Sequence, residues 1–147
     1  MFKRILLPLD GSPLAEQAIP YAVAQAERFG AEIVLLRVVE PLRGAPGAST
    51  SVMNSVERRL GDIARQYLDE IAGGLQARGL GVRTVVASGR PHEEIVRFAE
   101  ENQVDLIVIC QHGQSGLSRW LMGTVADHVV RGATIPVLLV QASRQKS

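Results

Sequence analysis

The residues with the clearest potential for chemistry lie in one segment, from Cys110 to Thr124. This segment contains Gly113 and Gly116 and ends in the pair Gly123–Thr124, which directly precedes an amphipathic stretch. Glycines let the backbone approach a ligand, and a helix N-terminus presents free N–H donors that suit phosphate. Glycines also make ordinary turns and threonine caps helices, so the spacing alone leaves a phosphate site and a simple turn equally open.

A second candidate is Asp10, which follows the apolar run from Ile5 to Leu9. Its carboxylate can accept hydrogen bonds from a sugar or a base. Asp-Gly-Ser is also a common turn sequence, so Asp10 could instead stabilise a turn and cap the following helix alongside Ser12.

Five short apolar runs provide the strands that would position these residues. They are nearly continuous in Ile, Val and Leu, which is typical of parallel strands covered on both faces. The runs are 5–9, 33–39, 82–87, 106–109 and 137–140.

Helical patterns separate most of these runs. The first helix is expected from Ser12 to Gly30, with Pro20 bending it in the middle. A mobile loop over 41–52 and then a long helix ending near Gly79 should follow. The apolar stripe of this long helix comprises Val56, Leu60, Ile63, Ala64, Tyr67, Ile71 and Leu75. Further helices should begin at Pro91 and Thr124.

This alternation predicts an α/β fold with an open, doubly wound, five-stranded parallel sheet in the order 3-2-1-4-5 and helices on both faces. We expect a single domain over residues 1–147, because no repeat or linker interrupts the pattern. In such a sheet, ligands bind beyond the carboxyl ends of the strands, where the strand order reverses.

Several stretches resemble the universal stress protein family, and the resemblance spans essentially the whole chain. They are the opening 5–12, the second strand 34–39, the segment after 110 and the end 136–140. The ATP-binding branch of that family carries Gly, two residues, Gly, nine residues and Gly-Ser or Gly-Thr. Here nine residues separate Gly113 from Gly123–Thr124, while Cys110 replaces the first glycine.

The resemblance implies a role for each matching residue. Asp10 would contact the adenosine portion of ATP with Pro8 beside it, and the backbone of Val38 would meet the adenine edge. A second set, Gly113, Gly123 and Thr124, would hold the phosphates together with Mg²⁺ or Mn²⁺. His112 is not part of the family motif; its place in the same segment leaves a phosphate contact and a solvated loop residue equally open.

Cys110 is the departure from the family pattern. Its side chain adds atoms where the pattern has bare backbone, but cysteine is small and can pack as an apolar residue. We therefore expect Cys110 to be tolerated beside the nucleotide. A redox-sensor role is the less favoured interpretation, because it requires exposure and a lowered pKa.

Composition argues against other classes of protein. The net charge of +1 and the 4% aromatic content provide neither a basic patch nor stacking platforms for nucleic acid. The apolar start is too short and contains Pro8, so we expect no signal peptide, no membrane partner and a cytoplasmic location.

The leading hypothesis is a non-enzymatic, ATP-binding stress-response module in which nucleotide orders residues 111–122 and alters a surface read by an unknown protein partner. A nucleotide-free dimeric stress protein is the alternative, and a slow ATPase or nucleotidyl-transfer enzyme is the third. The only lysines are Lys3 and Lys146, neither placed to assist phosphoryl transfer. The resemblance and the apolar last strand also imply a homodimer through residues 137–140.

Overall fold

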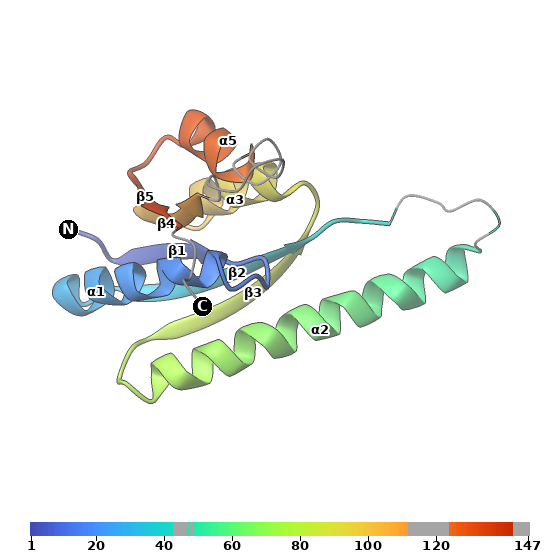
Figure 1. The fold of residues 1–147 in the computed structure, drawn as a ribbon, viewed down its shortest axis with the longest axis horizontal. Helices are drawn as coiled ribbons and strands as arrows, with labels where there is room; N and C mark the ends of the chain where they lie inside the picture. Colours follow the sequence, from blue (N-terminus) through green and yellow to red (C-terminus); the bar gives the residue numbers. More distant parts are fainter. Residues whose placement is uncertain (43–46, 48, 112–123, 143–147) are drawn as a thin grey trace.

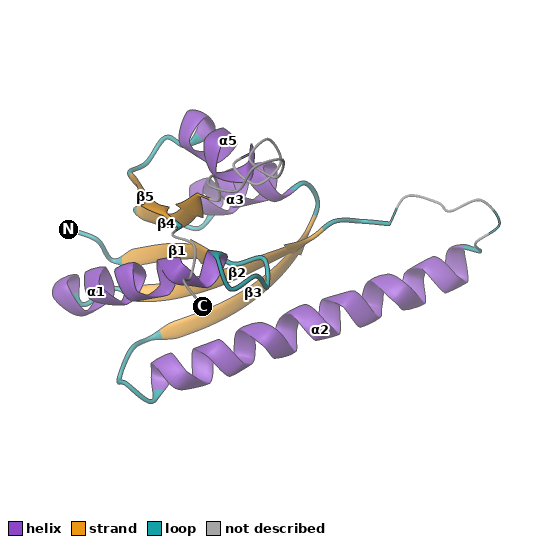
Figure 2. Cartoon of the chain, in the orientation of Figure 1, coloured by secondary structure: helices purple, strands orange, loops and turns teal. Residues whose placement is uncertain are grey.

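The chain forms a five-stranded parallel sheet with helices on both faces (Figures 1 and 2). The computed structural model describes residues 1–42, 47, 49–111 and 124–142. The strands are β1 (Arg4–Pro8), β2 (Glu32–Val39), β3 (Val82–Ser88), β4 (Leu106–Gln111) and β5 (Val137–Gln141). Their order is β3-β2-β1-β4-β5, which confirms the predicted topology.

Each face of the sheet has its own apolar core. Ile5, Leu7 and Leu35 point to one face, where they pack with residues of α1 (Ile19–Phe29) and α2 (Thr50–Gln76). The alternate residues, such as Leu6 and Val34, pack with α3 (Pro91–Glu101) and α5 (Thr124–Gly132) on the other face. Burial on both sides explains why the strands read as continuous apolar runs.

The first helical region differs from the expectation at Pro20. Residues Ala15–Ala18 form a short 3₁₀ turn, and the α-helix proper begins at Ile19, so Pro20 lies in its first turn. Proline fits there because the first N–H groups of a helix have no intrahelical acceptor. The expected bend at Pro20 is therefore wrong. Gly30 does end the helix, in the left-handed conformation at φ 67°.

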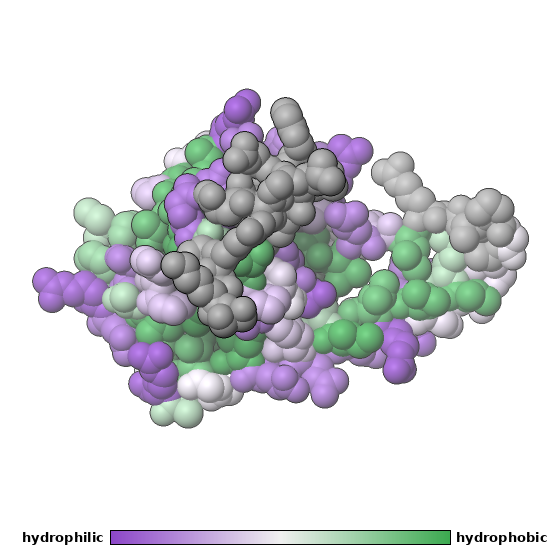
Figure 3. All heavy atoms as spheres, in the orientation of Figure 1, coloured by the Kyte–Doolittle hydropathy of each residue, from purple (hydrophilic) through white to green (hydrophobic). Residues whose placement is uncertain are grey.

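The long helix α2 begins earlier than expected and is covered along only part of its length. Ser49 caps it by accepting a hydrogen bond from the Val52 N–H at 3.1 Å, so its first turn occupies the end of the segment expected to be a loop. Ala64, Leu68, Ala72 and Leu75 are buried, and the helix packs on β2 and β3. The first part projects beyond the sheet (Figures 1 and 3), where Val56, Leu60 and Ile63 are exposed.

The two edges of the sheet differ in their surroundings. At one edge, β3 lies beside β2 under α2, and at the other β5 pairs only with β4.

None of the described helices combines the length and apolarity needed to cross a lipid bilayer.

Candidate functional site

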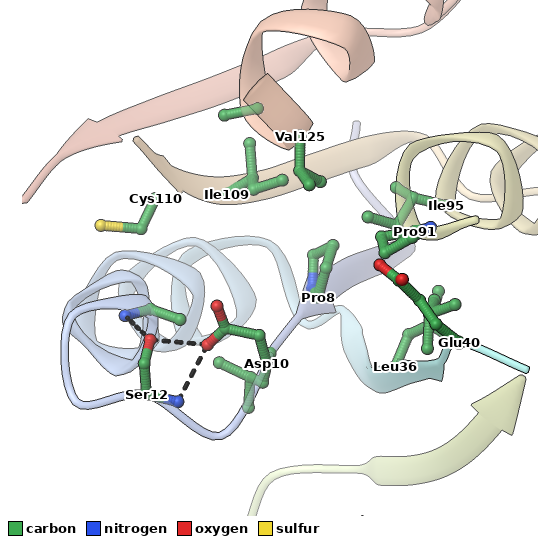
Figure 4. A pocket seen from close by; sticks show the side chains of 14 residues that line it. Pro8, Asp10, Ser12, Leu36, Glu40, Pro91, Ile95, Ile109, Cys110 and Val125 are labelled. Carbon is green, nitrogen blue, oxygen red and sulfur yellow. Dashed lines mark hydrogen bonds between the residues drawn. The ribbon is translucent and has the colours of Figure 1, made fainter. Parts of the chain in front are cut away.

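A cavity of about 450 Å³ opens at the carboxyl ends of β1, β2 and β4 (Figure 4). This is the place where the strand order reverses, because β1 pairs with β2 on one side and with β4 on the other. The first turns of α3 and α5 complete the wall. The lining residues are Pro8, Leu9, Asp10, Ser12, Ala15, Leu36, Val38, Glu40, Pro91, Ile95, Ile109, Cys110, Val125 and Ala126.

Asp10 holds the tight turn that follows β1. Its Oδ1 accepts hydrogen bonds from the Ser12 N–H at 2.9 Å and from the Ser12 hydroxyl at 2.6 Å. The Ser12 Oγ in turn accepts from the Ala15 N–H at 3.1 Å. The turn-forming contacts considered from sequence are thus present, while Asp10 also lines the cavity. In Figure 4 its second carboxylate oxygen points away from Ser12, so it can receive a ligand donor.

Gly11 lets the turn pass closely over Arg37. Its φ is +88°, and a Cβ at this position would lie 2.6 Å from the Arg37 Nη1. The Arg37 guanidinium lies over the ring of Tyr67, 5.2 Å from its centroid, and the Tyr67 hydroxyl donates to Glu16 at 2.6 Å. Burial, followed by the contact with Glu16, raises the pKa of Tyr67 above its ordinary range. A layer of side chains from the 3₁₀ turn, α2 and β2 therefore supports the turn that carries Asp10.

The hydrogen-bond pattern of β2 indicates that the N–H and C=O groups of Val38 face the cavity. In a parallel ladder, successive residues direct their N–H and C=O groups alternately to the two neighbouring strands. The Leu36 carbonyl accepts from the Leu9 N–H, on the β1 side, and the Val39 carbonyl accepts from the Gly89 N–H, on the β3 side. The polar groups of Val38 therefore point to the β1 side, where the chain has already turned away.

Cys110 is buried at the wall of the cavity, with 7% of its surface exposed. It packs in the same apolar cluster as Ala15 and Ala18. Burial, with a smaller contribution from the Asp10 carboxylate, raises the pKa of its thiol to about 11. A thiol that holds its proton so firmly is a poor nucleophile, which favours the packing role over the redox sensor.

The structure brings four of the sequence-derived site residues together, namely Pro8, Asp10, Val38 and Cys110. Thr124 begins α5 as expected, but its side chain is not among the described parts. His112, Gly113 and Gly123 lie outside the described residues, so their phosphate-binding roles stay predictions.

Several lining residues were missed from sequence. Glu40 lies two residues beyond Val38, and Pro91 begins α3; both line the cavity, but the sequence analysis assigned neither of them to the site. Apolar wall residues such as Ile95 and Val125 were not assigned to the site either. Their signal was available, because the first turns of helices that follow parallel strands reach the same edge of the sheet.

The charge of the cavity is uneven. Among the described lining residues, Asp10 and Glu40 are acidic and none is basic. In Figure 4 the two carboxylates lie at different sides of an apolar floor that includes Pro8 and Leu36. No group of three or more His, Cys, Asp or Glu side chains converges on a potential metal site within the described parts of the chain.

Comparisons with known proteins point in one direction. Residues 1–141 match the model of the universal stress protein family. Universal stress protein MJ0577 of Methanocaldococcus jannaschii is 32% identical, with 96% of each chain covered. The solved structure of MJ0577 superposes with a TM-score of 0.83 over 100% of this chain and 99% of that one.

Two more distant structures share the fold and were solved with nucleotides. One is a universal stress protein in complex with cAMP, at 22% identity and a TM-score of 0.67, covering 97% of this chain and 98% of that one. The other is a family member from Arabidopsis thaliana with AMP bound, at 16% identity and a TM-score of 0.70, covering 96% and 92%.

Proposed function

This chain belongs to the universal stress protein family, and we propose that it is a regulatory module that binds ATP, together with Mg²⁺ or Mn²⁺, in the cavity beyond β1, β2 and β4. The observation that carries the proposal is the cavity itself, in which Asp10 and the free backbone edge of Val38 flank an apolar floor. Its volume of about 450 Å³ lies in the range of small-molecule sites.

The nucleoside part of ATP fits the chemistry of the described lining. A flat purine suits apolar walls such as Leu36, Ile95 and Val125. The N–H and C=O of Val38 can pair with the acceptor and the amino group at the adenine edge, and Asp10 can accept from a ribose hydroxyl. The cAMP and AMP carried by two structures of the same fold support an adenine nucleotide as the class of ligand.

The triphosphate requires positive charge that the described lining lacks. Asp10 and Glu40 would repel an uncompensated polyanion, so a divalent cation bound to the phosphates should accompany the nucleotide. The N-terminus of α5, which begins at Thr124, supplies the second favourable contribution through its N–H groups and dipole. Gly113, Gly123 and His112 are proposed to complete this end of the site.

A thermal-shift series tests the proposal. A ligand present at 100 times its Kd stabilises the folded state by about 2.7 kcal/mol, so MgATP should raise the Tm of the wild-type protein. Asp10→Ala should reduce this increase, because it removes a ligand contact. It also removes the acceptor of both Ser12 hydrogen bonds, so Asp10→Asn, which retains an acceptor oxygen, is the matched control for the turn.

The nucleotide-free alternative makes a different prediction. Mass spectrometry of small molecules released from freshly purified, denatured protein should detect an adenine nucleotide if the ATP-binding proposal is correct. No released nucleotide, together with no thermal shift at about 1 mM MgATP, would favour a role in protein interaction alone. Steady phosphate release well above background would instead favour the slow ATPase.

We further propose a homodimer through β5. This strand has a neighbour on one side only, and Leu138 and Leu139 are only half-buried. An apolar edge strand of this kind favours pairing with another chain. Light scattering of the wild-type protein tests it, and a monomer at every concentration would contradict it.

A further inference from the structure

The projecting part of α2 carries an apolar stripe that the described chain does not cover. Val52, Val56, Leu60 and Ile63 are 55%, 41%, 37% and 50% exposed. Their spacing of four, four and three residues keeps them on one side of the helix. Figure 3 shows apolar side chains following this projecting part of the molecule. Four adjacent exposed aliphatic side chains on one helix face are typical of an interaction surface.

Two glycines on the same helix are unexplained by the single chain. Gly73 and Gly74 lie in the last turns of α2, and neither has a positive φ. A Cβ at either position would meet no atom within 4 Å. Glycine inside a helix is less favourable than alanine by roughly 0.8–1 kcal/mol. Bare backbone at this place does permit close approach by a second helix.

Two charged residues lie on the same side of α2 as the stripe, and their charges indicate what kind of helix could pack there. Arg59 is seven residues after Val52, and Glu70 is seven residues after Ile63, so both lie on the side of the stripe. Both side chains are exposed, and neither forms an ion pair within the described parts of the chain. Their signs are opposite, and eleven residues separate them, which is about 16 Å along a helix.

We propose that α2 pairs with α2 of a second copy of this chain, antiparallel, about a two-fold axis that crosses the exposed side of the helix at the level of Ala64–Arg65. This axis lies midway between Arg59 and Glu70, so it places Arg59 beside Glu70 of the partner subunit and repeats the contact symmetrically. The same rotation brings Val56 level with Gly73 of the partner subunit, next to its Gly74. The two charges, the two glycines and Val56 of the stripe thereby receive one common explanation.

This surface is separate from the nucleotide cavity and from β5. Arg59 and Glu70 are absent from the cavity lining. The helix α2 packs against β2 and β3, whereas β5 forms the opposite edge of the sheet. Pairing through α2 can therefore coexist with pairing through β5, and each contact can be removed without touching the other.

Charge reversal tests the pairing without disturbing the core. Sedimentation equilibrium of full-length wild-type protein should show one association step that Arg59→Glu and Glu70→Arg each weaken roughly tenfold, because two symmetric ion pairs become repulsive. The double variant Arg59→Glu/Glu70→Arg should restore wild-type association. Arg65 is exposed but lies two residues after Ile63, about 200° around the helix from the stripe, so Arg65→Glu should leave association unchanged.

The double variant Arg59→Glu/Glu70→Arg is the decisive test of the antiparallel pairing. Failure of the paired reversal to recover association, or equal effects of Arg65→Glu and Arg59→Glu, would overturn the antiparallel pairing. A wild-type protein that stays monomeric at about 1 mM would also overturn it, as would an oligomer that none of these variants weakens. A loss of one association step that is confined to the single reversals of Arg59 and Glu70 would support it.

Discussion

The two halves of α2 have similar apolar patterns and opposite surroundings. In the second half, Leu68 is fully buried and packs with the core beneath β1 and β2. In the first half, Leu60 lies eight residues earlier, about 80° around the helix from Leu68, and is 37% exposed. Helical periodicity therefore identifies which side of a helix is apolar, while the sheet decides how much of that side is covered. The part of the apolar side that the sheet leaves uncovered is where a second molecule can bind.

Truncating one leucine in each half should separate them most clearly. Leu68→Ala should lower the free energy of unfolding by about 2–5 kcal/mol, because it removes buried contacts and leaves a cavity. Leu60→Ala should change it by less than about 0.5 kcal/mol at protein concentrations low enough to keep the chain monomeric. Urea unfolding followed by circular dichroism measures both, and equal losses would contradict the contrast.

Thiol reactivity sharpens the same comparison. The pKa of Cys110 is raised from 9.0 to about 11, so near pH 8 its thiolate is about 100-fold scarcer than that of an ordinary cysteine. In a Cys110→Ala background, the exposed variant Val56→Cys should react with iodoacetamide at least 100-fold faster than Cys110 does in the wild type. The rates are read by mass spectrometry, and fast labelling of native Cys110 would contradict its burial.

The same shift gives the pH dependence a definite sign. The folded protein keeps the Cys110 proton more firmly than the unfolded chain, so the stabilisation is complete below about pH 9 and is lost as pH rises towards about 11. Cys110→Ala should remove this component of the alkaline decline. Urea unfolding series at pH 8 and pH 10.5 would measure it, and an identical decline in the variant would reject the assignment.

The smallest expected effect concerns Gly74. Gly74→Ala should stabilise the monomer by roughly 0.8–1 kcal/mol through helix propensity, because the added methyl group meets no atom within 4 Å. If α2 pairs as proposed, the same substitution should weaken association. Stabilisation without any change in association would place Gly74 outside the interface.

Much of this fold could be predicted from sequence. Strands buried on both faces appear as apolar runs, and Gly30 ends α1 because glycine readily adopts the left-handed conformation found there. The error at Pro20 arose because a continuous apolar period conceals the change from a 3₁₀ turn to an α-helix. The exposure of Val56 was beyond a sequence-based prediction, since it depends on how far the sheet extends beneath α2.

The site was predictable where it depends on position along a strand. Asp10 was a candidate because it follows a strand, while Pro8 and Val38 were implied by the family resemblance, and the structure gathers all three with Cys110 around one cavity. Glu40 and Val125 were missed because sequence does not tell which residues beyond a strand turn inward. The predicted phosphate contacts of Gly113 and Gly123 lie outside the described residues and stay predictions.

Calorimetric titration of the wild-type protein with MgATP is the most direct test of the cavity's role. The account predicts one nucleotide bound per chain, with adenosine competing for the same site because the described lining recognises the nucleoside. It also predicts weaker binding when Mg²⁺ is chelated, since two carboxylates face the cavity. The absence of binding heat at about 1 mM nucleotide, at two temperatures, would contradict the assignment of this cavity to ATP.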